Sequence, residues 1–502
     1  TTSRDVNITL EGRDWDGGQP SLKGARIISA IENNTHDTWT GGRMEYGKLD
    51  ATGGEIGGSG KFVGDYSGAI TLSGNSLSWP DQPPFSIVYV ELDIPFGQDV
   101  SSYLKYNADF LGNDHHMLEE SSDGKLEFTV NPAVIERRAH SKVGGISLSG
   151  LAETEVPFTK SSYTYNMPAE LEERVLDLRI PFMRCNKITA TLGHVPGGHQ
   201  MREEGIDMMH ELSSEWSIPE EDMMIELELK PGSEIGRLIK YSMDQGYGFR
   251  YWQIVNEPFN FGGYTPDTYI TQFEQVYDYL KEDYPEAQLG VCIKIKASDN
   301  NAKWRGYILD QLRGKYDFII PNAYNPGKDD WPETYEDRVL ANNWGMVNLC
   351  KQVKAMAEDF NTGKEIFQRD AEWGINRGQN RDSNPFNGAY PSAMHRLVRI
   401  MHYAQGDYMK SASAWTLFAY NDQRIGFGMV PRQSPEKSTL TYWMFYYFNR
   451  HCGTDIPQFS GSCPFYTGTF DGNEDLFGQT RMNSLQGPAT PVSVTVNDQP
   501  TK

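Results

Sequence analysis

The sequence is poor in cysteine and has no long run of apolar residues. Five cysteines in 502 residues are too few for a disulfide scaffold. Cys452 and Cys463 are close in sequence and could pair in an oxidising compartment, with free thiols as an equal alternative, and the other three read as small buried hydrophobes. No stretch reaches the roughly 18 apolar residues that a membrane crossing needs. We therefore predict no membrane insertion.

Basic residues are in the minority. Lysine and arginine number 46 against 68 acidic residues, a formal net charge of −22. Long-range repulsion then disfavours nucleic acid and anionic membranes as partners, but not a neutral polymer. The first residues do not form a charged and then apolar leader, so either the protein is cytosolic or a signal was removed or left out. We predict the second, a secreted or periplasmic protein.

Several signature motifs are also missing. There is no GxGxxG after a strand, no P-loop, no GxSxG elbow and no HExxH, which removes the commonest sequence evidence for nucleotide, serine-hydrolase or zinc-protease chemistry. His194 and His199 lie on the glycine-rich stretch 193-GHVPGGHQ-200, but no third metal ligand is near them in sequence. We predict no metal and no cofactor, and assign His194 to a sugar subsite.

What the sequence does contain changes character along the chain. The first 140 residues hold short β-rich runs such as 85-FSIVYVEL-92, separated by glycine and polar clusters such as 52-TGGEIGGSGKF-62. This pattern of short strands separated by turns predicts an accessory β-sandwich over 1–140. About fifty residues follow the last helical pattern, and in 454–502 the stretches 464–470 and 492–498 read as strands that could complete the sandwich.

From residue 141 to 453, strand and helix signals alternate. Helical spacing of apolar residues, opened by a proline, marks 266–282 and 391–406. Eight strands, most followed by a helix, predict an α/β fold, a (β/α)₈ TIM barrel. The strand candidates are 143–150, 178–185, 224–230, 250–256, 288–295, 317–324, 365–373 and 411–420.

Two glutamates end strands of this barrel. Glu257 follows the strand 250-RYWQIVN-256, and Pro258 prevents the ladder from continuing. Glu372 ends the strand that Gly374 closes. Catalytic groups of such barrels lie at the C-terminal ends of the strands. Two carboxyls there suggest glycoside hydrolysis, with retention when they are about 5–5.5 Å apart and inversion at about 6.5–9.5 Å.

These stretches resemble a known group of enzymes. The segments YWQIVNEP and GYTPDTYITQFEQVYDYLKEDYPEAQLGV resemble the fourth strand and helix of clan A glycoside hydrolases, including β-xylosidase-, arabinofuranosidase- and agarase-like members. AEWG is similar to the seventh strand of the clan, and TYWMFYYFNRHCG to the helix that closes the barrel. The resemblance covers about residues 142–453. It implies that Glu257 is the general acid/base and Glu372 the nucleophile.

The resemblance also implies roles for residues that bind the substrate or support the nucleophile. Asn256 would hydrogen-bond the sugar 2-OH. Arg184 in IPFMRC would pair with the nucleophile, with Arg179 as a rival. Tyr324 would hydrogen-bond the nucleophile. Asn322 stands where close relatives often carry a histidine.

Aromatic residues complete the candidate site. Trp415 matches the platform under the sugar next to the cleaved bond, although a buried core tryptophan is the alternative. Trp373 is among the aromatics that we expect at the rim, where they would line sugar subsites. The combined prediction is a retaining β-glycoside hydrolase acting on a polysaccharide, first of all a red-algal galactan such as agarose or porphyran, with xylan, β-glucan and mannan open. The alternative is a carbohydrate-binding barrel without catalysis.

Overall fold

The structure is a computed structural model, and it describes part of the chain. The described residues are 4–10, 21–29, 48–49, 55–56, 63–65, 67–74, 76–82, 86–93, 105–106, 118–148, 165–185, 203–228, 231–260, 263–295, 304–324, 339–340, 342–375, 390–419, 428–432, 434–463, 465–474 and 480–488. The barrel that positions the candidate site has its strands between Gly145 and Trp415.

Eight parallel strands close into a barrel in chain order, as predicted. Each predicted strand candidate contains or overlaps one of them, because strands buried on both faces read as apolar runs. They are β12 (Gly145–Leu148), β13 (Met183–Cys185), β14 (Met223–Leu227), β15 (Tyr251–Ile254), β16 (Gln288–Cys292), β17 (Phe318–Ile320), β18 (Phe367–Trp373) and β19 (Met409–Trp415).

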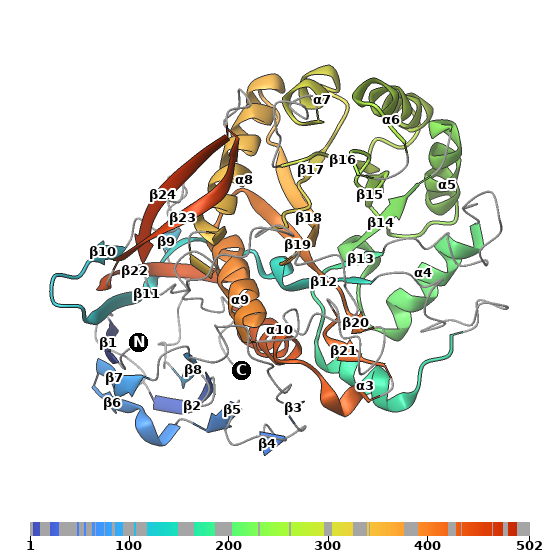
Figure 1. The fold of residues 1–502 in the computed structure, drawn as a ribbon. Coiled ribbons are helices and arrows are strands. Elements are labelled where there is room, and N and C mark those ends of the chain that lie inside the picture. Colours follow the sequence, from blue (N-terminus) through green and yellow to red (C-terminus); the bar gives the residue numbers. More distant parts are fainter. Residues whose placement is uncertain are drawn as a thin grey trace.

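Helices between the strands surround the barrel (Figure 1). Helix α6 shows why its sequence predicted it: Pro266 occupies the first turn, and Thr265 and Thr268 form a reciprocal capping box with bonds of 3.2 and 2.8 Å. The helices are α3 (Ala169–Asp177), α4 (Glu203–Glu215), α5 (Gly232–Asp244), α6 (Pro266–Leu280), α7 (Gly306–Gln311), α8 (Asn342–Phe360), α9 (Tyr390–Gln405) and α10 (Leu440–His451).

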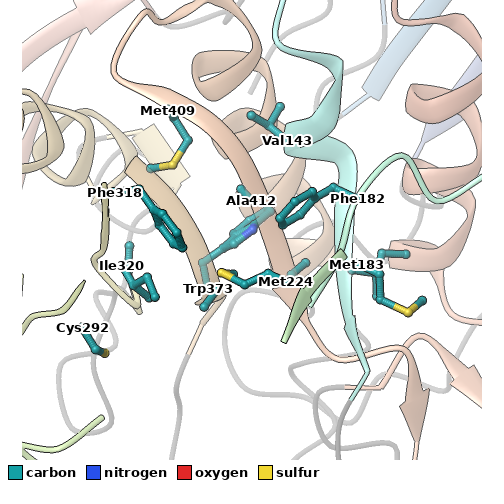
Figure 2. Packing of buried hydrophobic residues seen from close by; sticks show 14 of the residues in the cluster. Val143, Phe182, Met183, Met224, Cys292, Phe318, Ile320, Trp373, Met409 and Ala412 are labelled. Atoms are coloured by element: carbon teal, nitrogen blue, oxygen red, sulfur yellow. The ribbon is translucent and has the colours of Figure 1, made fainter. Parts of the chain in front are cut away.

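A single hydrophobic cluster joins the barrel strands to these helices. Figure 2 shows part of it, including Phe182 just before β13, Phe318 of β17 and Trp373 of β18. Inside the barrel, Arg369 lies over the ring of Tyr251, with its guanidinium carbon 3.6 Å from the ring centroid. A packed interior of this kind leaves chemistry to the strand ends.

A second, mixed sheet forms the additional β domain. Its order is β10-β22-β11-β1-β7-β6, with β9 paired to β11. A three-stranded sheet, β5-β2-β8, shares one hydrophobic core with it, as expected for a sandwich. The strands are β1 (Arg4–Leu10), β2 (Ser21–Ser29), β5 (Val63–Asp65), β6 (Thr71–Ser73), β7 (Ser76–Gln82), β8 (Ser86–Asp93), β9 (Lys105–Tyr106), β10 (Leu118–Glu120), β11 (Leu126–Arg138) and β22 (Asp455–Cys463).

The strand that the C-terminal part adds to this sheet is β22, which pairs with β11 and β10. The predicted strand at 464–470 exists as part of β23 (Phe465–Glu474), but it pairs with β24 (Thr480–Pro488) in a separate hairpin beside α8 (Figure 1). The predicted strand at 492–498 lies outside the described residues, and the predicted domain boundaries stay a prediction.

Short elements complete the described chain. Two-residue strands form β3 (Lys48–Leu49) with β4 (Glu55–Ile56), and β20 (Phe418–Ala419) with β21 (Val430–Pro431). Single 3₁₀ turns cover Ser67–Ala69, Ser141–Gly144, Glu220–Asp222 and Pro435–Lys437. All five cysteines are described and are thiols, so Cys452 and Cys463 form no disulfide. Within the described residues, no helix has both the length and the apolar character for a membrane span.

Candidate active site

The candidate site begins where strand β15 stops. Asn256 and Glu257 follow this strand at the mouth of the barrel. Val255 and Glu257 have φ angles of 64° and 39°, in the left-handed region that costs a residue other than glycine about 1–3 kcal/mol. The backbone thereby leaves strand alternation, and the Asn256 side chain meets the inward-facing Gln253, whose Nε2 lies 3.1 Å from Asn256 Oδ1.

An irregularity in β18 determines where Glu372 points. Between Asp370 and Trp373, the pairing of β18 with β19 shifts in register, so β18 carries an extra residue there. A bulge of this kind reverses the alternation of side chains. As a result Asp370 faces helix α9, while Glu372 faces Arg184 inside the barrel.

Glu372 accepts hydrogen bonds on both carboxylate oxygens. Arg184 Nη1 donates to Oε1 over 2.6 Å, and the Tyr324 hydroxyl donates to Oε2 over 3.1 Å. Arg184 belongs to β13, and Tyr324 follows β17 and bridges to Gly374 beside Glu372. An ionised donor makes the first of these bonds short and strong. Donors from two other strands thus fix the orientation of the carboxylate.

Glu257 lies in a different environment. It is 8% exposed, and it accepts from Asn260 Nδ2 over 3.0 Å and from Asn322 Nδ2 over 3.3 Å. Burial, and after it the negative charge of Glu372, raises the pKa of Glu257 to about 7, although the two asparagine bonds and the charge of Arg184 act against this. Glu257 therefore keeps its proton where an ordinary carboxyl group has lost it.

Short contacts connect the two carboxyl groups. Arg184 Nη2 donates to Asn256 Oδ1 over 3.0 Å, and Asn322 Nδ2 lies 3.4 Å from the same oxygen. Asn322 also has a left-handed backbone, with φ of 44°. The structure thus brings the predicted residues at the ends of β13, β15, β17 and β18 into one buried polar cluster. They are Arg184, Asn256, Glu257, Asn322, Tyr324 and Glu372.

Arg184 is the centre of a network that the sequence analysis did not identify. Its fully buried side chain forms an ion pair with Glu226 of β14 over 3.0 Å, donates from Nε to Gln253 over 3.0 Å, and lies 3.4 Å from Ser147 Oγ. Burial acts to lower the pKa of Arg184, but the charges of Glu372 and Glu226 outweigh it and raise the pKa. One sequence signal could have identified Glu226: it stands between Ile225 and Leu227 in MIELELK, a charged residue inside an apolar strand of the barrel.

Trp415 lies at the mouth beside this network. It ends β19, is half-buried, and its ring centroid is 5.9 Å from the guanidinium carbon of Arg184. The peptide bond from Trp415 to Thr416 is cis. Arg179, the rival of Arg184, is exposed in a turn before β13, so Arg184 is the arginine that contacts Glu372.

Trp373 is not at the rim where we expected it. It is fully buried (Figure 2), and its ring packs against Tyr403 of α9 and Phe445 of α10, with centroids 5.9 and 6.2 Å apart. Adjacent residues of a strand point to opposite faces. The bulge that turns Glu372 inward therefore turns Trp373 outward into the core between barrel and helices.

The two histidines of the predicted sugar subsite fall in a stretch that the structure does not describe. His194 and His199 belong to 186–202, which is outside the described residues, so the subsite assignment of His194 stays a prediction. Among the residues that the structure describes, no group of three histidine, cysteine or carboxylate side chains could hold a metal ion.

Comparison with solved structures identifies proteins of the same fold. An α-L-arabinofuranosidase from Thermotoga maritima, in complex with arabinose, has a TM-score of 0.50 and 15% identity, over 72% of this chain and 80% of that chain. The thermostable α-L-arabinofuranosidase from Thermotoga petrophila has a TM-score of 0.50 and 15% identity, over 72% and 81%. No family model matches the sequence, and no curated protein matches it. At this identity the likeness shows a shared fold.

Proposed function

We propose that this chain is a retaining glycoside hydrolase that cleaves β-glycosidic bonds of a polysaccharide by double displacement. The observation that carries the proposal is a pair of buried carboxyl groups in unlike environments at one barrel mouth. Glu257 has a pKa of about 7, whereas Glu372 is held by Arg184 and Tyr324. Two carboxyl groups whose environments separate their protonation states are what this reaction requires. The fold shared with α-L-arabinofuranosidases supports the same class of chemistry.

In the first step, the Glu372 carboxylate attacks the anomeric carbon while Glu257 donates its proton to the glycosidic oxygen. The bond between the anomeric carbon and that oxygen breaks, and the leaving sugar departs as an alcohol. The product on the enzyme is a covalent glycosyl ester of Glu372. Glu257 is suited to this donation because it remains protonated near neutral pH.

In the second step, Glu257 is a carboxylate and accepts a proton from water. The water oxygen attacks the anomeric carbon from the face that the leaving group occupied, and the ester bond to Glu372 breaks. Once the ester has removed the negative charge of Glu372, one of the two causes that raise the pKa of Glu257 is gone. The same residue therefore changes from acid to base between the steps.

Two neighbouring side chains fit the binding of the reacting sugar. Asn256 lies next to Glu257, with its amide oxygen already engaged by Arg184, which leaves its amide group to donate to a sugar hydroxyl. Trp415 offers a half-buried indole face at the end of β19, and such a face stacks on the C–H side of a pyranose. The hydrogen bond from Asn256 would strengthen as the ring flattens toward the transition state.

A substrate panel tests the proposal. It begins with agarose and porphyran, extends to xylan, β-glucan and mannan, and includes aryl β-xylosides and α-L-arabinofuranosides. Thin-layer chromatography follows the products, and proton NMR gives the anomeric configuration of the product that forms first. Product of retained configuration on any β-linked substrate supports the proposal. Cleavage of α-L-arabinofuranosides alone would mean that the enzyme cleaves α and not β linkages. No product on the whole panel, with saccharide binding intact, would favour the alternative, a carbohydrate-binding barrel without catalysis.

The role of Glu372 has its own test. Glu372→Ala should lose turnover by a factor on the order of 10⁴ or more, because the covalent intermediate no longer forms. Azide can enter the space that the side chain leaves, and it should restore turnover on an aryl glycoside with a glycosyl azide of inverted configuration as product. Unimpaired hydrolysis by this variant would remove Glu372 from the mechanism.

A further inference from the structure

A short turn after β17 contacts both carboxyl groups of the site. Asn322 Nδ2 donates to Glu257 over 3.3 Å, and the Tyr324 hydroxyl donates to Glu372 over 3.1 Å. Only Ala323 separates these two residues. The conformation of this turn therefore sets the position of one hydrogen-bond donor for each carboxyl group.

Two buried ionisable side chains hold the turn by its backbone. The Ala323 N–H donates to Asp370 Oδ1 over 3.2 Å, and the Ala323 carbonyl oxygen accepts from Arg399 Nη1 over 3.3 Å. Asp370 and Arg399 are both fully buried. Both polar groups of one peptide residue are thus bound from outside the barrel.

Helix α9 fixes this pair in place. The Tyr403 hydroxyl donates to Asp370 Oδ2 over 3.1 Å and lies 3.4 Å from Arg399 Nη1. Arg399 Nε donates to Asn343 of α8 over 2.5 Å. Residues 399 and 403 are one helical turn apart and share a face, so the stretch of α9 beside the turn presents a polar surface to it.

The turn needs such support. Asn322 has φ of 44°, a strained conformation that persists only where the surroundings impose it. Burying a carboxyl group and a guanidinium group is also a poor device for stability alone, because the desolvation penalty often equals what their interactions return. A role in fixing geometry explains why ionisable groups occupy this interior position.

We propose that Asp370 and Arg399 are positioning residues, which hold the 322–324 turn and thereby orient both Glu372 and Glu257; this inference rests on the proposed function. Neither side chain contacts a carboxyl group of the candidate site. Their effect passes through the backbone of Ala323 to Asn322 on one side and Tyr324 on the other.

The test combines kinetics with a crystal structure of the Arg399→Met variant. Met fills similar volume but cannot donate to the Ala323 carbonyl oxygen. We expect kcat to fall roughly 10- to 100-fold with KM changed less than about threefold, because small misplacements of reacting groups cost rate more than binding. In the crystal structure the Tyr324–Glu372 contact should be lost. Arg399→Lys keeps a donor and should recover part of kcat.

Arg450→Met is the matched control. Arg450 of α10 donates to the Asp177 carboxylate over 3.0 Å, so its loss removes a helix ion pair of the barrel without touching the turn. A fall in kcat for Arg399→Met no larger than for Arg450→Met would overturn the inference. A Tyr324–Glu372 contact that persists near 3.1 Å in the Arg399→Met crystal structure would overturn it as well.

Two further arms keep the test decisive. If Arg399→Met does not fold, Tyr403→Phe removes the bond to Asp370 and the acceptor 3.4 Å from Arg399 Nη1, while it keeps both of those side chains. It should lower kcat about threefold or more with KM kept. An unchanged kcat would overturn the inference. If the wild type cleaves nothing on the substrate panel, the proposed function fails. The geometry of the 322–324 turn in the variant crystal structure then still decides whether Asp370 and Arg399 position it.

Discussion

Replacing Glu257 by glutamine should stabilise the protein at neutral pH while it removes the acid of the proposed reaction. The pKa of Glu257 rises from 4.5 to about 7 on folding. At about 1.36 kcal/mol per pKa unit, this amounts to roughly 3 kcal/mol of disfavoured ionisation. Between these two pH values the folded state binds the proton that the unfolded state has released. The stability of the wild type therefore falls as pH rises from about 4.5 to about 7.

Glutamine has no proton to lose, so Glu257→Gln should not show this part of the fall. The two proteins should be similar in stability near pH 4, and the variant should be more stable by roughly 3 kcal/mol at pH 8. For a barrel of roughly 300 residues, the average entropy of unfolding makes this a Tm difference of about 5 °C. Burial also raises the pKa of Asp370 to about 7, but this contribution cancels in the difference between the two proteins.

Differential scanning calorimetry at pH 4, 5, 6, 7 and 8 measures this difference. Glu282→Gln is the control, because Glu282 is exposed after α6 and the same substitution there changes no buried group. The same ionisation should appear in kinetics, as a loss of kcat/KM with an apparent pKa near 7. A Tm difference for Glu257→Gln that stays constant from pH 4 to pH 8 would refute the reasoning.

Two more substitutions probe the groups around Arg184. Glu226→Gln should fold normally, because an amide oxygen still accepts from Arg184. It should lower kcat about tenfold or more with little change in KM. An unaltered kcat in steady-state assays would contradict a role for the charge of Glu226. Trp415→Ala should raise KM roughly 2- to 12-fold through lost stacking, and Trp415→Phe should retain most of the binding. Equal KM values for wild type and Trp415→Ala in steady-state assays would show that the indole packs in the core and does not bind the sugar.

The barrel was predictable because its signals are local. Buried parallel strands are apolar runs, and Pro, Gly and Asn mark where they end. The strand β22 was not predictable in the same way, because 455-DIPQFSGSC-463 contains Pro457 and Gly461 and has little intrinsic preference for a strand. Its pairing with β11, which lies more than 300 residues earlier in the sequence, supplies what its own residues do not.

In the candidate site, too, local sequence signals predict some features, and only the packing reveals the others. The Asn-Glu-Pro sequence after β15 could be recognised as a strand end, because none of its three residues favours continuing the strand. The orientation of Trp373 depends on a bulge, and an extra residue in a pairing leaves no mark in the alternation of one strand. Arg399 lies in a helix whose arginines suggest a solvent-facing side. Only the packing of α9 against the ends of β17 and β18 shows that it is buried.

The charge of the site follows from the way Arg184 is shared. Among the described residues, Arg184 is ion-paired with two carboxylates, Glu372 and Glu226, so these three side chains together carry a net negative charge. Breaking a glycosidic bond develops positive charge at the anomeric carbon and ring oxygen, and a preorganised negative site stabilises that charge. If Arg184 were paired with Glu372 alone, the proposed nucleophile would be neutralised by the group that orients it. Glu226 takes up part of the positive field, and Arg184 can therefore position Glu372 without cancelling the charge that the proposed reaction needs.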